Sequence, residues 1–289
     1  MFTRRNKTSR AGAARKSPLK ALTLLGVLVV MAVYISIGNR QRAAPPVAVT
    51  STQVPSRAVP GEPAVNPILA QIRPPAGVTR QDGIGVAVLL DTTGSMGDSV
   101  PDASAGRQPK LQIAKRAVLA LLAQADKAAA AAPARNIQVG VYEFSERNQF
   151  DDCRRVTSLG PLNLTAARSA VNPLTASGGT PIGNAMIMAL QDLGASGLAH
   201  RHVLVVTDGE NNRGYAPADV LNALAGLPAE DRPAVYFVAF DISADRFRTL
   251  RDGGAMVLAA SNEPELQQTL DYILTGKILA EQPSPGGAP

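Results

Sequence analysis

The chain of 289 residues has one cysteine, two histidines and no tryptophan. A single cysteine cannot form an intramolecular disulfide, and Cys153 has no CxxC or Cys/His partner at zinc spacing. These shortages exclude a disulfide scaffold and a structural zinc site. Hydrophobic residues make up 45% of the chain and charged residues 18%, a balance typical of a globular protein with one or two domains.

Acidic residues are missing from residues 1–42, which contain nine Lys and Arg. The rest of the chain has the other 20 basic residues and all 23 acidic ones, so its net charge is −3 although the whole chain has +6. A mildly acidic body without a basic stripe is a poor match for a phosphate backbone. We therefore expect no nucleic-acid partner and attribute the positive charge to targeting.

Charges are also absent from residues 21–38, which read ALTLLGVLVVMAVYISIG. As a helix this segment would extend about 27 Å, close to the roughly 30 Å hydrocarbon core of a bilayer. Seven Lys and Arg precede it in residues 1–20 and only Arg40 and Arg42 follow closely, so the positive-inside rule places the N-terminus in the cytoplasm. We expect a transmembrane helix here. The alternative is a cleaved signal peptide, whose apolar core is usually about 7–15 residues before a small-x-small site.

The remainder divides by composition. Residues 39–82 are rich in proline and predict a stiff linker without a packing role. Residues 83–280 alternate β-rich runs with amphipathic segments, the clearest being a helix over 110–132 closed by Pro133. Residues 281–289 predict a disordered tail. The β-rich runs are 84–90, 137–144, 202–207, 235–240 and 256–259.

Apolar runs separated by helices predict a doubly wound α/β domain, with a mostly parallel sheet covered by helices on both faces. Ligands of such sheets sit at the carboxyl ends of the strands. Asp91, Thr93 and Ser95 follow the first run, Asp208 follows the third, and Thr180 lies in a glycine turn between them. Carboxylates and hydroxyls from three loops suit a hard divalent cation such as magnesium.

These residues also carry a resemblance. The stretches VAVLLDTTGSM, VGVYEFS, GGTPIG and VLVVTDGEN resemble, in order, the blocks of the von Willebrand factor type A domain. The similarity covers roughly residues 82–279. It implies a metal-ion-dependent adhesion site in which Asp91, Thr93 and Ser95 match the D-x-S/T-x-S loop, Thr180 the lone threonine and Asp208 the later aspartate.

The resemblance implies a bound magnesium or manganese ion and a protein partner that contributes an exposed Asp or Glu. Each position taken alone has a structural interpretation. Asp91 would simply end a strand, Thr180 before Pro181 would cap a helix, and Asp208 before Gly209 would form a turn. The ordered combination after successive strands favours the metal site.

An enzyme was weighed against this binding site. Residues 93–97 lack only the first glycine of a G-x-S-x-G motif, and His200 and His202 follow later in the chain. Both histidines precede or begin the 202–207 run, so we expect an exposed loop residue and a strand-edge residue at the opposite end of the sheet from Ser95. No P-loop is present. We therefore expect no catalytic activity.

The sequence predicts a membrane-tethered, extracytoplasmic module that binds a protein carboxylate through a divalent cation. The alternative is an assembly component of a cell-envelope complex in which the metal only braces the loops. The loops 97–109 and 211–215 flank the expected site and would select the partner. The basic anchor and the lack of disulfides favour a bacterial cytoplasmic membrane with the domain on its periplasmic side.

Overall fold

The computed structural model describes residues 66–102, 106–148 and 151–281. The expected cytoplasmic N-terminus, the 21–38 span and most of the linker lie outside these residues. Within the described ranges, no helix is both long and apolar enough to cross a membrane.

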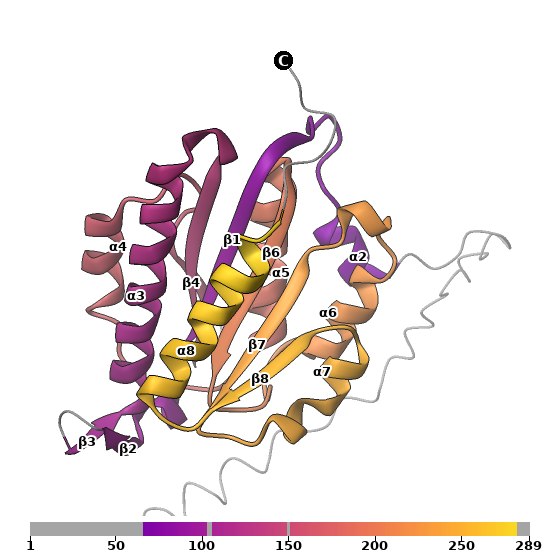
Figure 1. Cartoon of the computed structure of the whole chain (residues 1–289). Coiled ribbons are helices and arrows are strands. Elements are labelled where there is room, and N and C mark those ends of the chain that lie inside the picture. Colours follow the sequence, from indigo (N-terminus) through magenta and orange to yellow (C-terminus); the bar gives the residue numbers. More distant parts are fainter. Residues whose placement is uncertain (1–65, 103–105, 149–150, 282–289) are drawn as a thin grey trace, which may run out of the picture. The chain divides into compact units, whose positions relative to one another are not determined.

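A six-stranded sheet forms the centre of the domain, in the order β5-β4-β1-β6-β7-β8 (Figure 1). All neighbouring pairs are parallel except β4 with β5, which are antiparallel. The predicted α/β fold with a mostly parallel sheet is therefore confirmed. The six strands are β1 (Gln81–Asp91), β4 (Ile137–Asn148), β5 (Asp151–Thr157), β6 (Leu198–Thr207), β7 (Ala234–Phe240) and β8 (Met256–Ala260).

Helices cover both faces of this sheet (Figure 1). One face packs against α3 (Lys110–Ala131), α4 (Leu164–Val171) and α8 (Glu263–Ile273). The other packs against α2 (Pro67–Ile72), α5 (Ile182–Ser196), α6 (Pro217–Leu224) and α7 (Arg248–Asp252). Short helical turns occupy Gly94–Gly97, Pro133–Arg135, Ala229–Asp231, Ala244–Phe247 and, as a π-helix, Leu274–Ile278.

The two-sided burial explains why the strands are almost wholly apolar. In β1, Val86, Val88 and Leu90 join the core under α3 and α8, while Ala87 and Leu89 join the core under α5. Successive side chains of a strand point to opposite faces, so a strand covered on both faces needs a continuous apolar run. This requirement is what made β1 recognisable in the sequence.

Two expectations about individual segments were wrong, and one strand was not predicted. Part of the expected linker forms α2, whose Ile68 and Ile72 are buried in the core, so this part does have a packing role. The expected loop at 97–109 contains a hairpin of β2 (Ser99–Asp102) and β3 (Gly106–Pro109). The antiparallel strand β5 was not predicted because its DDCRRVT sequence is mostly polar and lies at the sheet edge.

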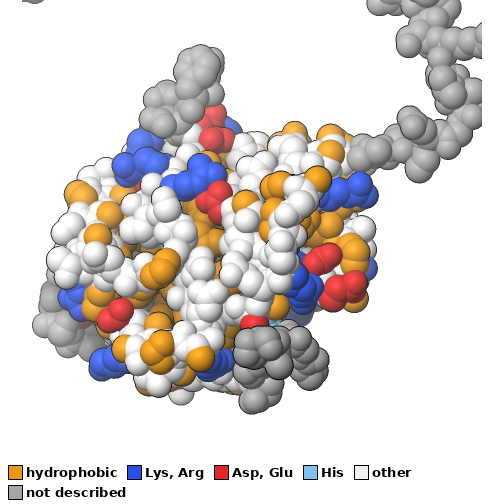
Figure 2. All heavy atoms as spheres, turned by 90° about the horizontal axis from the view of Figure 1, so that it is seen from above, with side chains coloured by type: hydrophobic (Ala, Val, Ile, Leu, Met, Phe, Trp, Pro, Cys, Tyr) orange, Lys and Arg blue, Asp and Glu red, His pale blue; other side chains and the backbone are white. Residues whose placement is uncertain are grey.

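Charged side chains of both signs neighbour one another on the face seen in Figure 2. Among described residues, Arg80 and Arg201 both pair with Asp231, at 3.3 and 3.0 Å between nitrogen and oxygen. Both arginines of this group are therefore paired locally with an acidic side chain.

Candidate metal centre

The five predicted ligands come from three loops at the carboxyl edge of the sheet. β1 ends at Asp91, and Thr93 and Ser95 follow in the short turn after it. β6 lies directly beside β1 and ends at Thr207, so Asp208 leaves the same edge. The order of the strands therefore brings Asp91 and Asp208 together although they are distant in the sequence.

Asp91 is fully buried and hydrogen-bonded through both carboxylate oxygens. Oδ1 accepts from the backbone N–H of Thr93 at 2.8 Å, and Oδ2 accepts from the Thr207 hydroxyl at 2.6 Å. Burial raises the pKa of Asp91 from 3.8 to about 6, against the lowering effect of these hydrogen bonds, and nearby Asp208 raises it further. A cation at this point would compensate for the buried negative charge.

A chain of oxygen atoms connects the first loop to Asp208. The Thr93 and Ser95 hydroxyl oxygens lie 3.3 Å apart, and the Ser95 hydroxyl donates to Oδ1 of Asp208 at 2.7 Å. Oδ2 of Asp208 accepts from the Lys110 ammonium at 3.1 Å. Four of the predicted residues therefore lie around one small polar region.

Thr180 reaches the same region from the loop before α5. A Cβ placed on Gly209 would lie 3.7 Å from the Ser95 hydroxyl oxygen and 3.9 Å from that of Thr180, so both hydroxyls flank Gly209. The capping interpretation of Thr180 is wrong, because α5 begins at Ile182 and has Pro181 at its N-cap with no side-chain hydrogen bond. Among the described residues, the Thr180 hydroxyl has no hydrogen-bond partner.

Backbone hydrogen bonds fix the Thr180 loop against its neighbours. Gly94 N–H donates to the Gly178 carbonyl at 3.0 Å, and Ser177 N–H donates to the Thr92 carbonyl at 2.9 Å. Asn212 Oδ1 accepts from Thr180 N–H at 2.8 Å. These contacts hold the three loops in one arrangement without using the Thr180 hydroxyl.

The donor set suits a hard cation bound mainly through oxygen. In the described part of the chain no three His, Cys, Asp or Glu side chains gather in a metal-binding cluster. A cation here would instead depend on two carboxylates and three hydroxyls, which matches the oxygen preference of magnesium and manganese rather than a thiolate or imidazole site. The residues present therefore fit such an ion.

Three further residues of the centre were missed in the sequence. Thr207 orients Asp91, and Lys110 lies between Asp208 and Asp241. Asp241 directly follows β7, so the rule that ligands gather at carboxyl ends of strands would have found it. Lys110 opens α3, and nothing in the helical pattern distinguishes it from a solvent-exposed lysine.

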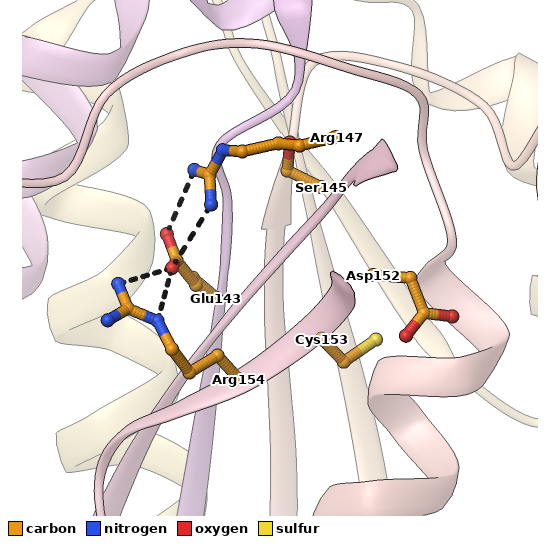
Figure 3. Close-up of a pocket in the computed structure, with 6 residues that line it drawn as sticks. All are labelled: Glu143, Ser145, Arg147, Asp152, Cys153 and Arg154. Atoms are coloured by element: carbon orange, nitrogen blue, oxygen red, sulfur yellow. Dashed lines mark hydrogen bonds and ion pairs between the residues drawn. The ribbon is translucent and has the colours of Figure 1, made fainter. Parts of the chain in front are cut away.

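A second polar cluster adjoins the centre but contains none of the predicted ligands (Figure 3). It lines a cavity of about 260 Å³. The carboxylate of buried Glu143 in β4 accepts hydrogen bonds from Nε of Arg154 at 2.7 Å and from the hydroxyl of Thr92 at 3.2 Å. A guanidinium nitrogen of Arg147 lies 3.4 Å from the same carboxylate. Arg147 also donates to the hydroxyl of Ser177 at 2.9 Å. The cluster therefore contacts the loop after Asp91 through Thr92 and the loop before Thr180 through Ser177.

The two histidines are placed differently from the prediction. β6 begins at Leu198, so both lie within the strand, and His202 is fully buried instead of being at its edge. His200 pairs in register with Ile84, and Nδ1 of His200 lies 2.6 Å from Glu281. At about 3.3 Å per residue, His200 and His202 lie roughly 17–23 Å from the Asp91 end of β1. No histidine of the chain therefore lies near Ser95.

Residues 86–210 match the model of the von Willebrand factor type A domain. Comparison with curated proteins gave no match.

Three solved structures share the fold. The first is a von Willebrand factor type A protein from Catenulispora acidiphila, with 19% identity and a TM-score of 0.51 over 70% of this chain and 44% of that chain. The second is the von Willebrand factor domain of the type V pili tip protein Mfa5 from Porphyromonas gingivalis, with 11% identity and a TM-score of 0.52 over 70% of this chain and 98% of that chain. The third is proximal thread matrix protein 1 from the mussel byssus with a zinc-occupied MIDAS motif, with 16% identity and a TM-score of 0.50 over 68% of this chain and 48% of that chain. This chain thus spans less than half of the Catenulispora and mussel chains. Residues 86–210 are thus similar to the von Willebrand factor type A domain, and the solved structures share the fold of this chain.

Proposed function

We propose that this chain is a membrane-tethered, extracytoplasmic binding module that holds a protein partner through a divalent cation. The cation is magnesium or manganese, and an Asp or Glu of the partner completes its coordination. The observation that carries the proposal is the convergence of oxygen atoms from three loops at one edge of the sheet. The protein ligands are Asp91, Thr93, Ser95, Thr180 and Asp208.

The chemistry of the donor set favours partner binding. When bound, the cation supplies an electrophilic centre with a position for an external carboxylate. Only Asp91 and Asp208 bring negative charge among the five ligands, and Lys110 already neutralises part of it. Neutral hydroxyls leave a bound cation most of its charge, whereas a carboxylate-rich cage would satisfy it.

Structural neighbours give independent support for a protein partner. The Porphyromonas neighbour is a pilus tip protein and the mussel neighbour is a thread matrix protein. The zinc in the mussel protein's MIDAS motif also makes zinc the appropriate competing cation in a selectivity test. The alternative for this chain is an assembly role in which the cation only braces the loops.

Metal binding is tested first on the purified full chain. At a hundredfold excess of magnesium over its Kd, the free energy of unfolding should rise by about 2.7 kcal/mol. Asp91→Asn and Thr180→Ala should lose this increase, because each removes a ligand. Thr175→Ala is the matched control, since Thr175 is an exposed threonine of the same loop. Equal stability in magnesium and in EDTA would rule out the metal centre.

Partner capture separates the two functions. The immobilised full chain should retain a protein from a cell-envelope extract in magnesium and release it in EDTA. Thr180→Ala should capture nothing, whereas Thr175→Ala should behave as wild type. Changing one acidic residue of the captured protein to its amide should abolish binding, because shape is kept and charge is lost. Capture that persists in EDTA would instead favour the bracing role.

The membrane tether is tested by fractionation and a fusion. Because seven basic residues precede the 21–38 segment and two follow it closely, the N-terminus should be cytoplasmic. The full-length chain should remain with membranes through carbonate washing, and a reporter that works only outside the cytoplasm should be active after Pro289. A soluble product trimmed near residue 42 would show that the segment is a cleaved signal.

A further inference from the structure

Lys110 introduces a fixed positive charge beside the proposed metal centre. Its ammonium lies 3.1 Å from Oδ2 of Asp208 and 2.9 Å from Oδ2 of Asp241. Its side chain is only 10% exposed, and its backbone N–H donates to the carbonyl of Asp98 at 2.9 Å. The first residue of α3 is thus held in place from both its backbone and its side chain.

Asp241 is the second carboxylate that pairs with Lys110. It has a φ of 54°, a left-handed conformation that is uncommon for a non-glycine residue. Its N–H donates to the carbonyl of Ala260 at 2.8 Å, and its carboxylate is partly exposed. The strained backbone places a second carboxylate where it can share the ammonium with Asp208.

The formal charges of the proposed centre and its ion pairs sum to −2 at neutral pH. Asp91, Asp208 and Asp241 contribute three negative charges, and Lys110 contributes one positive charge. One divalent cation balances that sum. Without the ammonium the sum would be −3, and Oδ2 of Asp208 would have no cationic partner among the described residues.

From this arrangement we propose that Lys110 is an internal counter-cation that lowers the affinity of the centre for divalent metal, and that Asp241 limits the effect by sharing the ammonium. The inference rests on the proposed function, because it concerns the same metal centre. An ammonium repels an incoming dication and competes with it for Oδ2 of Asp208. The repulsion is strong at this separation, because two charges a few ångströms apart near a protein surface are screened far less than in bulk water.

The inference predicts opposite effects for the two partners. Lys110→Gln keeps a hydrogen-bond donor but removes the charge, so Kd for manganese should fall at least about tenfold. Asp241→Asn should raise Kd several-fold, because Lys110 then has only Asp208 as an ionic partner. Asparagine is the suitable replacement, since it also tolerates a left-handed backbone. Lys127→Gln is the control, because Lys127 is exposed about 25 Å further along α3.

Calorimetric titration of manganese into the full chain measures all four Kd values. Lys110→Met is the second variant if Lys110→Gln misfolds. Thermal melting without metal checks that each protein is folded. A purely structural Lys110 would give weaker metal binding in both Lys110→Gln and Asp241→Asn. If wild type binds metal and Lys110→Gln binds no more tightly, this inference fails and the proposed function stands.

If neither protein binds manganese, the inference and the proposed function both fail. If only Lys110→Gln binds, Lys110 controls the centre as inferred, and the metal-dependent function of the wild-type chain fails. These outcomes therefore distinguish failure of the inference about Lys110 from failure of the proposed function.

Discussion

Gly178→Ala should lower the free energy of unfolding by about 2–5 kcal/mol and abolish metal binding. Gly178 has a φ of 77°, and a Cβ at this position would lie 2.2 Å from the carbonyl oxygen of Glu146. The left-handed backbone alone costs an alanine about 1–2 kcal/mol, and overpacking typically adds about 1–3 kcal/mol. The obstacle is backbone, so no side-chain rotation relieves it.

The surrounding hydrogen bonds prevent the loop from moving aside cheaply. Gly179 and Glu146 exchange two backbone hydrogen bonds at 3.0 and 3.1 Å, and the Gly178 carbonyl accepts from Gly94. Displacing Gly178 would break these contacts and shift Thr180, which lies two residues further on. The loss of metal affinity follows from that shift.

Gly254→Ala separates the two contributions. Gly254 also has a left-handed φ, 93°, but a Cβ there would meet nothing within 4 Å. Gly254→Ala should therefore lower the free energy of unfolding only by the cost of the left-handed backbone, about 1–2 kcal/mol, and should leave metal binding intact. Urea unfolding in EDTA measures both variants. Equal losses for the two would show that the Glu146 contact is unimportant.

The predictable part of the fold is the part buried on both faces. β1, β4, β6, β7 and β8 carry the near-continuous apolar runs that a covered parallel sheet requires, and each contains the run predicted for it. β5 could not be found in this way, because an edge strand is stabilised by pairing with β4 and has no apolar pattern of its own. The sequence signal is therefore strongest where burial is most complete.

α2 illustrates a different limit. Its six residues, PILAQI, are too few to show helical periodicity, and the surrounding prolines suggested a linker. In the structure Asn66 caps the helix by accepting from Ile68 N–H at 2.9 Å, and Pro67 occupies the first turn. Both are helix-start signals. The decisive factor is tertiary, since Ile68 and Ile72 have α5 and α6 to pack against.

The candidate site was predictable as far as the edge of the sheet on which it lies. Asp91 and Asp208 were expected at the same edge because each lies at the carboxyl end of a parallel strand, whereas the direct pairing of β1 with β6 was not predicted. The partners that set their charge were not predictable. Lys110 reaches Asp208 only because α3 begins beneath that loop, and Thr207 reaches Asp91 only through the β1–β6 register. Such contacts depend on three-dimensional placement rather than on spacing in the chain.

Asp91→Asn should stabilise the metal-free chain at pH 7.5, by up to about 3 kcal/mol. Burial raises the pKa of Asp91 to about 6 in the folded protein, from 3.8 when it is solvated. The folded state therefore holds its proton more tightly than the unfolded state does. This contribution of roughly 3 kcal/mol is fully present below pH 3.8 and is lost as the pH rises through about 6.

The substitution keeps the local hydrogen bonds. The asparagine oxygen accepts from Thr93 N–H as the carboxylate does, and its amide donates to the Thr207 hydroxyl oxygen. Thr207 then directs its own proton to the carbonyl of Gly209, 3.0 Å away. The main change is the removal of a buried charge, which is why stabilisation is expected.

Asp192→Asn is the control with the opposite sign. Burial alone would raise the pKa of Asp192, but hydrogen bonds from Arg155 and Tyr142 hold it below its usual value. Its ionised form therefore stabilises the fold above pH 3.8 and loses this effect as the pH falls, so Asp192→Asn should destabilise the chain at pH 7.5.

Urea unfolding in EDTA between pH 4 and 7.5 tests both carboxylates. The advantage of Asp91→Asn over wild type should grow as the pH rises and be smallest at pH 4. With magnesium added, the free energy of unfolding of wild type should rise and that of Asp91→Asn should not. The difference in stability between the two proteins should therefore shrink or change sign. An Asp91→Asn protein that is less stable than wild type at pH 7.5 in EDTA would contradict the prediction. A carboxylate that costs stability in the empty site and restores it on metal binding is kept for the cation rather than for the fold.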